Sequence, residues 1–255
     1  MKIAAVIITY NEEDRLPDAL ASLRQVADEI VVIDSFSTDR TVEIAQEAGA
    51  RVVQNRFEDY GQQKNFAMAQ AGCEWILNLD ADERVSPELQ RAIAAWKEGA
   101  APLNAAAFAI KRKTFYLGRW IRHSGWYPDR KIRLFRKDAA AWHGRIHERL
   151  DVRGSVARLE GDILHFTYRD IGDHVRRLDR YSAFQAEEIL RQEKKCLFLR
   201  LAILPPVTFL RHYAWKLGWL DGFPGLVIAI IQSWGTALKY LKAIALKRRA
   251  RESGR

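Results

Sequence analysis

The chain has 255 residues and 48% of them are hydrophobic, so it can bury a sizeable core, and a disordered chain is excluded. Two cysteines are too few for a disulfide framework or a zinc site, which favours a reducing compartment. The formal net charge of +9 suits nucleic acid, an anionic substrate or an anionic membrane surface. Residues 3–8 form an apolar run of only about strand length, so we assign no export signal.

Residues 1–80 alternate short apolar runs with amphipathic stretches, in the rhythm of βαβ units. The apolar runs are residues 3–8, 30–33, 51–53 and 75–79. The stretches between them gather leucine, isoleucine, valine and alanine on one helical face. This pattern predicts an α/β fold in which helices flank a parallel sheet.

Polar side chains follow three of these predicted strands. They are Thr9 to Glu12 after the first strand, Asp34 and Ser35 after the second, and Asp80 with Asp82 after the fourth. Ligands bind at the carboxyl ends of strands in an open parallel sheet, so we expect these side chains to meet in one crevice. The sequence has no glycine-rich dinucleotide fingerprint after the first strand and no Walker-type loop. A nucleotide would therefore be held by side chains and a metal.

The carboxylates of Asp80 and Asp82 are typical of a site for Mg²⁺ or Mn²⁺. Such a hard cation takes one or two protein carboxylates and leaves positions for phosphate oxygens and water, which points to chemistry on a diphosphate. The alternative is an acidic turn before a helix that begins near Ser86, because Asp, Ser and Pro are favoured at helix starts.

The pattern changes from about residue 105. Residues 108–112 and 132–136 alternate as strands on either side of an aromatic segment, and after residue 165 the pattern becomes helical. Residues 111–149 hold twelve Lys or Arg against three acids. Trp120 and Trp126 in this part could stack on sugar rings or be ordinary core residues.

The C-terminal part of the chain is apolar and basic. Residues 222–238 contain no charge, but this length is at the lower limit for a spanning helix, which needs about twenty residues. Trp215, Trp219 and Trp234, with the basic residues of 239–255, suit helices that lie among lipid headgroups. We therefore expect peripheral attachment to a membrane surface. The alternative is a helical pair that only covers the core.

Four motifs together resemble inverting family 2 glycosyltransferases, which have the GT-A fold. They are residues 6–12, 32–39, 61–65 and 80–83, and they match in order and spacing. Residues 125–135 and 144–148 are similar to the lipopolysaccharide core branch, whose members add β-glucose to an inner-core heptose.

The resemblance implies a nucleotide-diphospho-sugar transferase of the GT-A fold, with a Rossmann-like, mostly parallel sheet and a helical extension that associates with the membrane. Residues 1–104 would be the nucleotide-sugar-binding half. Residues 105–170 would be the acceptor-binding and catalytic half of the same domain, and residues 171–255 the extension.

The resemblance also implies which residues bind the nucleotide-sugar donor and its metal. Four residues would border the nucleoside, namely Thr9, Tyr10, Asn11 and Glu12. Asp34 would accept a hydrogen bond from the pyrimidine N–H, unless it only caps a turn. Lys64 would reach the diphosphate as a point charge, unless it is a solvated helix lysine. Asp82 would bind the metal, Asp80 would face the ribose or a metal-bound water, and His165 would complete the metal shell or be a core histidine.

Inverting transfer also needs a base that takes the proton of the acceptor hydroxyl as its oxygen attacks the anomeric carbon. Glu148 is the first candidate for this base, because it lies in the basic stretch where the acceptor is expected. Asp129 is the second, because it could instead pair with a neighbouring arginine. Arg130 and Arg133 could bind the donor diphosphate or acceptor phosphates, or line a solvated strand face.

These expectations describe a metal-dependent inverting glycosyltransferase that is peripheral to the cytoplasmic face of the inner membrane. It would move a sugar, with glucose favoured, from a UDP-linked donor to an inner-core heptose on a lipid-linked oligosaccharide. Nucleic acid is not expected as a partner, because the second basic patch follows a long apolar stretch. The alternatives are a polyprenyl-phosphate glycosyltransferase and a catalytically silent membrane-associated binding module.

Overall fold

The computed structural model describes residues 1–100, 104–144 and 148–253, which form two compact units. The first unit comprises residues 1–113 and 129–165. The second comprises residues 114–128 and the chain from residue 166 onward. The division into functional halves at residue 104 remains a prediction.

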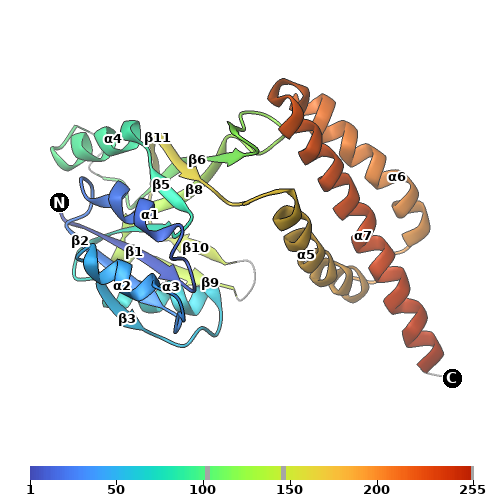
Figure 1. Ribbon diagram of the computed structural model, residues 1–255, viewed down its shortest axis with the longest axis horizontal. Helices are drawn as coiled ribbons and strands as arrows, with labels where there is room; N and C mark the ends of the chain where they lie inside the picture. Colours follow the sequence, from blue (N-terminus) through green and yellow to red (C-terminus); the bar gives the residue numbers. More distant parts are fainter. Residues whose placement is uncertain (101–103, 145–147, 254–255) are drawn as a thin grey trace. The chain divides into compact units, whose positions relative to one another are not determined.

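The first unit is built on one sheet with the strand order β3-β2-β1-β4-β8-β6-β11-β5 (Figure 1). Its parallel strands are β1 (Ile3–Thr9), β2 (Glu29–Asp34), β3 (Arg51–Gln54) and β4 (Trp75–Asp80). The remaining strands on this path are β5 (Glu83–Val85), β6 (Ala107–Tyr116), β8 (Asp129–Arg136) and β11 (Val156–His165). β8 pairs antiparallel with β4 and with β6, and β5 pairs antiparallel with β11. The predicted parallel arrangement of the first four strands is confirmed.

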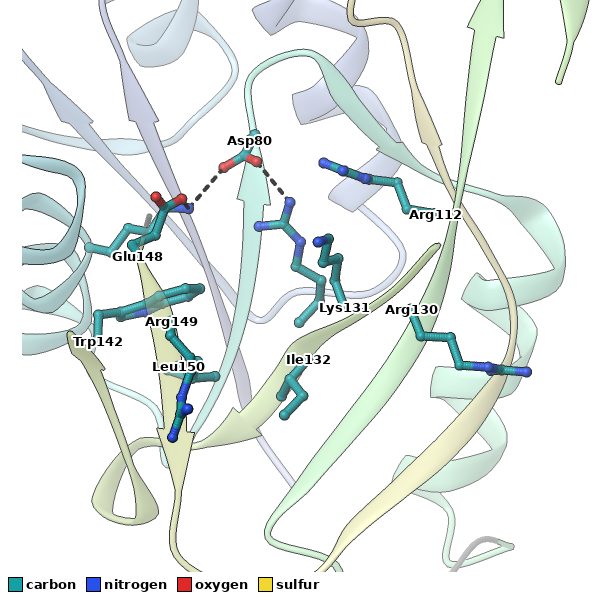
Figure 2. A pocket seen from close by; sticks show the side chains of 11 residues that line it. Asp80, Arg112, Arg130, Lys131, Ile132, Trp142, Glu148, Arg149 and Leu150 are labelled. Atoms are coloured by element: carbon teal, nitrogen blue, oxygen red, sulfur yellow. Dashed lines mark hydrogen bonds and ion pairs between the residues drawn. The ribbon is translucent and has the colours of Figure 1, made fainter. Parts of the chain in front are cut away.

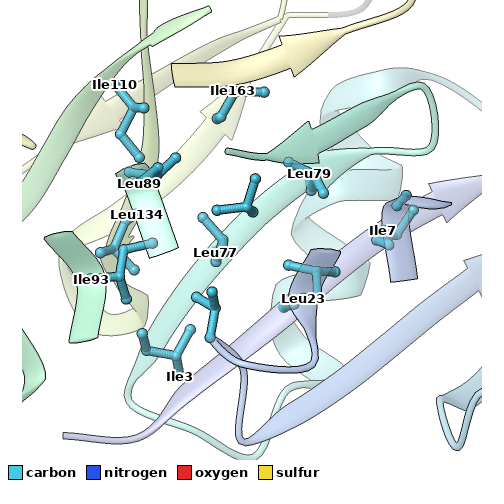
Figure 3. Close-up of a cluster of buried hydrophobic side chains, with 14 of the residues drawn as sticks. Ile3, Ile7, Leu23, Leu77, Leu79, Leu89, Ile93, Ile110, Leu134 and Ile163 are labelled. Carbon is cyan, nitrogen blue, oxygen red and sulfur yellow. The ribbon is translucent and has the colours of Figure 1, made fainter. Parts of the chain in front are cut away.

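Helices cover both faces of this sheet because successive residues of a strand point to opposite sides. The helices are α1 (Leu16–Leu23), α2 (Thr41–Glu47), α3 (Tyr60–Gln70) and α4 (Pro87–Lys97). On one side Ile3 and Ile7 of β1 pack with residues of α1, α2 and α4, and Figure 3 shows part of this cluster. On the other side Ala4 and Val6 pack with residues of α3. The layered arrangement confirms the predicted α/β fold class.

A small hairpin of β9 (Ala140–His143) and β10 (Arg149–Val152) packs beside α3, and the short 3₁₀ turn η1 (Lys137–Ala139) precedes it. The side chain of Asn65 fixes the hairpin by accepting a hydrogen bond from the backbone N–H of Trp142 and donating one to its carbonyl, at 2.9 and 2.8 Å. Part of the motif predicted at residues 144–148, namely residues 145–147, lies outside the described residues. Glu148 is described and directly precedes β10.

The second unit is helical, which confirms the predicted C-terminal helical extension (Figure 1). It contains α5 (Ile171–Arg191), α6 (Leu197–Leu210), the π-helical turn η2 (Arg211–Trp215), the 3₁₀ turn η3 (Gly218–Asp221) and α7 (Phe223–Ser253). The short strand β7 (Arg119–Trp120) pairs with the end of β6. Among the described helices, none has both the length and the hydrophobicity needed to cross a bilayer.

His174 of α5 lies in an aromatic cluster of the second unit. Its Nδ1 atom is 2.9 Å from the hydroxyl of Tyr116, and its ring stacks on Tyr168 with 4.1 Å between centroids. Burial lowers the pKa of His174 from the ordinary value of 6.5 to about 4, with Asp173 opposing this shift and Arg177 adding to it. The imidazole is therefore neutral in the folded chain at neutral pH.

Replacing His174 by phenylalanine should flatten the pH dependence of the unfolding free energy between about pH 6.5 and 4. The unfolded chain takes up the proton first, because the folded-state pKa of His174 is the lower one. The contribution of His174 to the free energy of unfolding is therefore fully present above pH 6.5. As the pH falls toward 4, this contribution is lost, which lowers the free energy of unfolding by roughly 3 kcal/mol. Urea unfolding at several pH values measures this. Parallel losses in wild type and variant would assign the dependence to other groups.

Candidate active site

The carboxyl ends of three strands lie side by side in the first unit. Thr9 ends β1 and is in register with Asp34, which ends β2. Asp80 ends β4 and is in register with Ile8 on the other side of β1. The structure thus brings together the strand-end residues that the βαβ rhythm places in one crevice.

A pocket of about 470 Å³ opens beside the end of β1. Its lining residues are Ile8, Thr9, Tyr10, Glu12, Ser35, Phe57 and Tyr60. The rings of Phe57 and Tyr60 meet edge to face with centroids 5.0 Å apart, and both are partly exposed. Flat, exposed aromatic faces and a few polar groups are suited to a planar base and a ribose.

Two of the predicted nucleoside residues hold the loops around this pocket. Asp34 is fully buried, and its carboxylate accepts hydrogen bonds from the backbone N–H and hydroxyl of Ser37 and from the hydroxyl of Thr9. Asn11 has a φ of 54° and accepts a hydrogen bond from the N–H of Thr38 at 2.8 Å. These bonds connect the loop after β1 to the loop after β2.

Asp80 is held by two cations. One of its oxygens accepts a 2.7 Å hydrogen bond from Arg133, and the other lies 3.6 Å from Nζ of Lys64. Burial raises the pKa of Asp80, but the charges of Arg133 and Lys64 and the hydrogen bond from Arg133 outweigh it, so this pKa lies well below its ordinary value. Asp80 is therefore a stable anion at neutral pH.

Asp82 and His165 lie together next to this carboxylate. His165 ends β11 and is in register with Glu83, which brings its Nε2 atom to 3.5 Å from an oxygen of Asp82. Arg15 lies 3.7 Å from the same oxygen. Burial raises the pKa of Asp82, but the hydrogen bond and charge of His165, with a smaller effect of Arg15, lower it overall.

The pair of Asp82 and His165 offers a divalent cation one oxygen and one nitrogen ligand. This small donor set fits an ion that takes its other ligands from a diphosphate and water. Asp82 and His165 therefore fit a metal that is shared with a substrate. Within residues 1–100, 104–144 and 148–253, no group of three or more His, Cys, Asp or Glu side chains that could hold a metal is found.

Glu148 lines a second pocket, of about 400 Å³, together with Lys64 and Asp80. The carboxylate of Glu148 is 3.0 Å from Nζ of Lys64, which also lies 4.6 Å above the ring of Trp142. Figure 2 shows Glu148 and Asp80 facing the same space, with Trp142 beneath Glu148. The other basic lining residues are Arg112, Arg130, Lys131, Arg133 and Arg149.

The sequence profile of glycosyl transferase family 2 matches residues 4–149. This range contains the ends of β1, β2 and β4, the pocket beside β1, and every lining residue of the second pocket except Leu150. The chain belongs to this family. Membership confirms that the protein is a glycosyltransferase, and with the observed sheet it confirms the predicted GT-A fold class.

Similar proteins cover nearly the whole length of this glycosyltransferase. An uncharacterized glycosyltransferase of Rickettsia typhi is 32% identical over 98% of this chain and 89% of its own. The lipopolysaccharide core biosynthesis glycosyltransferase LpsC of Rhizobium meliloti is 30% identical over 98% of this chain and 95% of its own. The crystal structure of S. aureus TarS 1-349 aligns with a TM-score of 0.48 and 16% identity, over 99% of this chain and 92% of that one.

The other predicted site residues of the glycosyltransferase differ in their surroundings. Asp129 begins β8 and accepts two hydrogen bonds from Arg112, at 2.7 and 3.1 Å. Arg133 is buried and bridges Asp80 and Glu83. Arg130 lines the pocket of Glu148, but its side chain points away from Asp80 in Figure 2. Glu148 is among the residues that line this pocket, and Asp129 is not.

Several residues at the site of the glycosyltransferase have roles that its sequence does not predict. Glu83 is fully buried and accepts hydrogen bonds from Arg133, from Arg112 and from the N–H of Asp80. Its only sequence signal is its place directly after Asp82. Trp142 packs beneath Lys64, and Phe57 and Tyr60 line the other pocket, and none of these aromatic residues stands in a distinctive pattern.

Proposed function

We propose that this glycosyltransferase moves a sugar, with glucose favoured, from a UDP-linked donor to an inner-core heptose of lipopolysaccharide by a single displacement that inverts the anomeric carbon. The observation that carries the proposal is the row Glu148, Lys64 and Asp80. Glu148 lies 3.0 Å from Lys64, and Lys64 lies 3.6 Å from Asp80, all beside one pocket. These distances support roles for Glu148 as the proposed base and for Lys64 as the proposed cation for the diphosphate.

The donor nucleoside would occupy the pocket beside β1, with Tyr10 and Tyr60 at its rim and Thr9 and Glu12 offering polar contacts. Lys64 would hold the diphosphate, because its Nζ lies at the strand-end edge and is shielded from solvent by Trp142. Asp82 and His165 would hold Mg²⁺ or Mn²⁺, which when bound would neutralise charge on the departing diphosphate.

Glu148 would take the acceptor proton. Its carboxylate is paired with Lys64, which has a second carboxylate partner in Asp80. A donor diphosphate would compete for Lys64 and free Glu148 for the acceptor hydroxyl. The acceptor oxygen then bonds to the anomeric carbon as the bond to the diphosphate breaks, and the proton passes to Glu148.

An anionic acceptor suits the remaining basic residues of the pocket. Arg130, Lys131 and Arg149 line it on the β8 and β10 side and could contact phosphates of a lipopolysaccharide core. The similarity to LpsC supports this acceptor class. Because such an acceptor is lipid-linked, the enzyme would work as a peripheral protein at the cytoplasmic face of the inner membrane.

A screen of nucleotide sugars against truncated core oligosaccharides, with and without EDTA, tests the proposed function. We expect one UDP-sugar to be transferred to a core acceptor, EDTA to suppress the transfer, and NMR to show an inverted anomeric configuration. A retained configuration would exclude the single displacement. Transfer to polyprenyl phosphate without any core acceptor would favour the alternative glycosyltransferase.

A further inference from the structure

The outer side of α6 is apolar and exposed. Four residues at helical spacing form it, namely Leu199, Ile203, Val207 and Leu210. Leu199 and Leu210 are 59% and 58% exposed. A stripe of this spacing lies on one side of a helix, and such a stripe normally packs against another element.

The opposite side of α6 already packs on α7. Leu201 and Leu204 join a cluster with Tyr240 and Ala243, and Ser233 of α7 donates a 2.8 Å hydrogen bond to the carbonyl of Pro205. Figure 1 shows the two helices side by side. The contacts of α6 with α7 therefore do not use the exposed stripe.

Two tryptophans in the turns η2 and η3, which follow α6 in the chain, are exposed as well. Trp215 is 84% exposed and Trp219 is 54% exposed. Indole rings combine an apolar body with one N–H donor, and they are enriched where lipid headgroups meet the hydrocarbon. The four stripe residues and these two tryptophans are called the α6 face below.

The charged residues within 194–220, the segment that carries the α6 face, are all basic. Residues 194–220 contain no Asp or Glu, but they contain the bases Lys194, Lys195, Arg200, Arg211 and Lys216. The next acid, Asp221, is buried and accepts hydrogen bonds from the backbone of Arg122 and His123. A second copy of the chain would present the same positive charge and be repelled, whereas an anionic lipid surface would be attracted.

We propose that the α6 face docks on an anionic lipid bilayer, with α6 lying in the plane of the headgroups. The exposed stripe runs along one side of the helix from Leu199 to Leu210, so inserting the whole stripe into the headgroup region would lay the helix axis along the membrane. The α6 face would be the surface by which the proposed peripheral enzyme contacts its membrane. The docking rests on the proposed function only for which membrane is bound. Vesicle binding needs no turnover, so either proposal can fail alone.

Sedimentation of the full chain with vesicles tests the docking. We expect binding to vesicles of phosphatidylcholine with phosphatidylglycerol to be at least about tenfold tighter than to phosphatidylcholine alone. The double variant Ile203→Glu with Val207→Glu should lose at least about tenfold of this binding, because it puts two charges into the apolar stripe. Arg211→Ala should lose about fivefold.

The matched control is the double variant Val175→Glu with Phe184→Glu, which changes two exposed apolar residues of α5 in the same unit. It should bind vesicles like wild type. Circular dichroism and thermal melting show whether each variant is folded. Equal losses in both double variants, or no preference for anionic vesicles, would overturn the proposal. So would a wild-type dimer, seen by analytical ultracentrifugation, that only the α6 variant dissociates.

Discussion

Replacing Glu148 by glutamine should lower kcat by about 10²- to 10⁴-fold, with the affinity for UDP within about fivefold of wild type. The amide keeps nearly the same shape but cannot accept the proton of the acceptor hydroxyl. Turnover with the donor found in the screen measures kcat, and calorimetric titration with UDP measures the donor affinity. Retained UDP binding with lost turnover would also exclude a catalytically silent binding module.

Asp129→Asn is the matched control for Glu148→Gln, since both changes remove one carboxylate charge from a candidate base. Asp129 already accepts two hydrogen bonds from Arg112, so its replacement should lower kcat by much less. A larger loss for Asp129→Asn than for Glu148→Gln would reverse the assignment of the base. Full activity of Glu148→Gln would remove Glu148 from the mechanism.

Replacing Arg133 by leucine should lower the free energy of unfolding by about 3–5 kcal/mol. Arg133 is buried and makes hydrogen bonds of 2.6 Å to Glu83 and 2.7 Å to Asp80. Without it, the fully buried carboxylate of Glu83 keeps the N–H of Asp80 at 3.1 Å, and Arg112 at 3.4 Å is the cation that still faces it. An uncompensated buried charge is among the few causes of losses this large. Urea denaturation measures the change.

Two further variants show whether charge is the cause of the loss at Arg133. Arg130→Leu removes an exposed arginine from β8, the strand that also carries Arg133. This change should alter the free energy of unfolding by less than about 0.5 kcal/mol. Adding Glu83→Leu to Arg133→Leu should restore part of the loss, because it removes the unpaired carboxylate. Similar losses for Arg133→Leu and Arg130→Leu would contradict the buried-charge explanation.

The parallel part of the sheet could be predicted from the sequence because it depends on local patterns. The apolar runs at 3–8, 30–33, 51–53 and 75–79 agree within one residue at each end with β1 to β4. The meeting of Thr9, Asp34 and Asp80 at one edge then follows from the parallel direction alone. Glu148 and His165 are different, because antiparallel strands that return from later in the chain bring them to this edge.

The surroundings of individual side chains could not be predicted, because partners far apart in sequence determine them. The alternation of apolar and basic residues on β8 does not show which basic residue is buried. Arg133 is the buried one, because it pairs with Asp80 and Glu83. Trp126 packs against Tyr116 and Tyr168 in the core of the second unit, which no short motif indicates.

A crystal structure with UDP and Mn²⁺ tests the proposed donor site most directly. We expect uracil in the pocket beside Thr9 and Tyr60, and an anomalous manganese signal within ligand distance of Asp82 and His165. We also expect the diphosphate on Lys64, with Glu148 released from that lysine. UDP bound away from the carboxyl ends of β1 and β4, or manganese without Asp82, would contradict the proposed donor site.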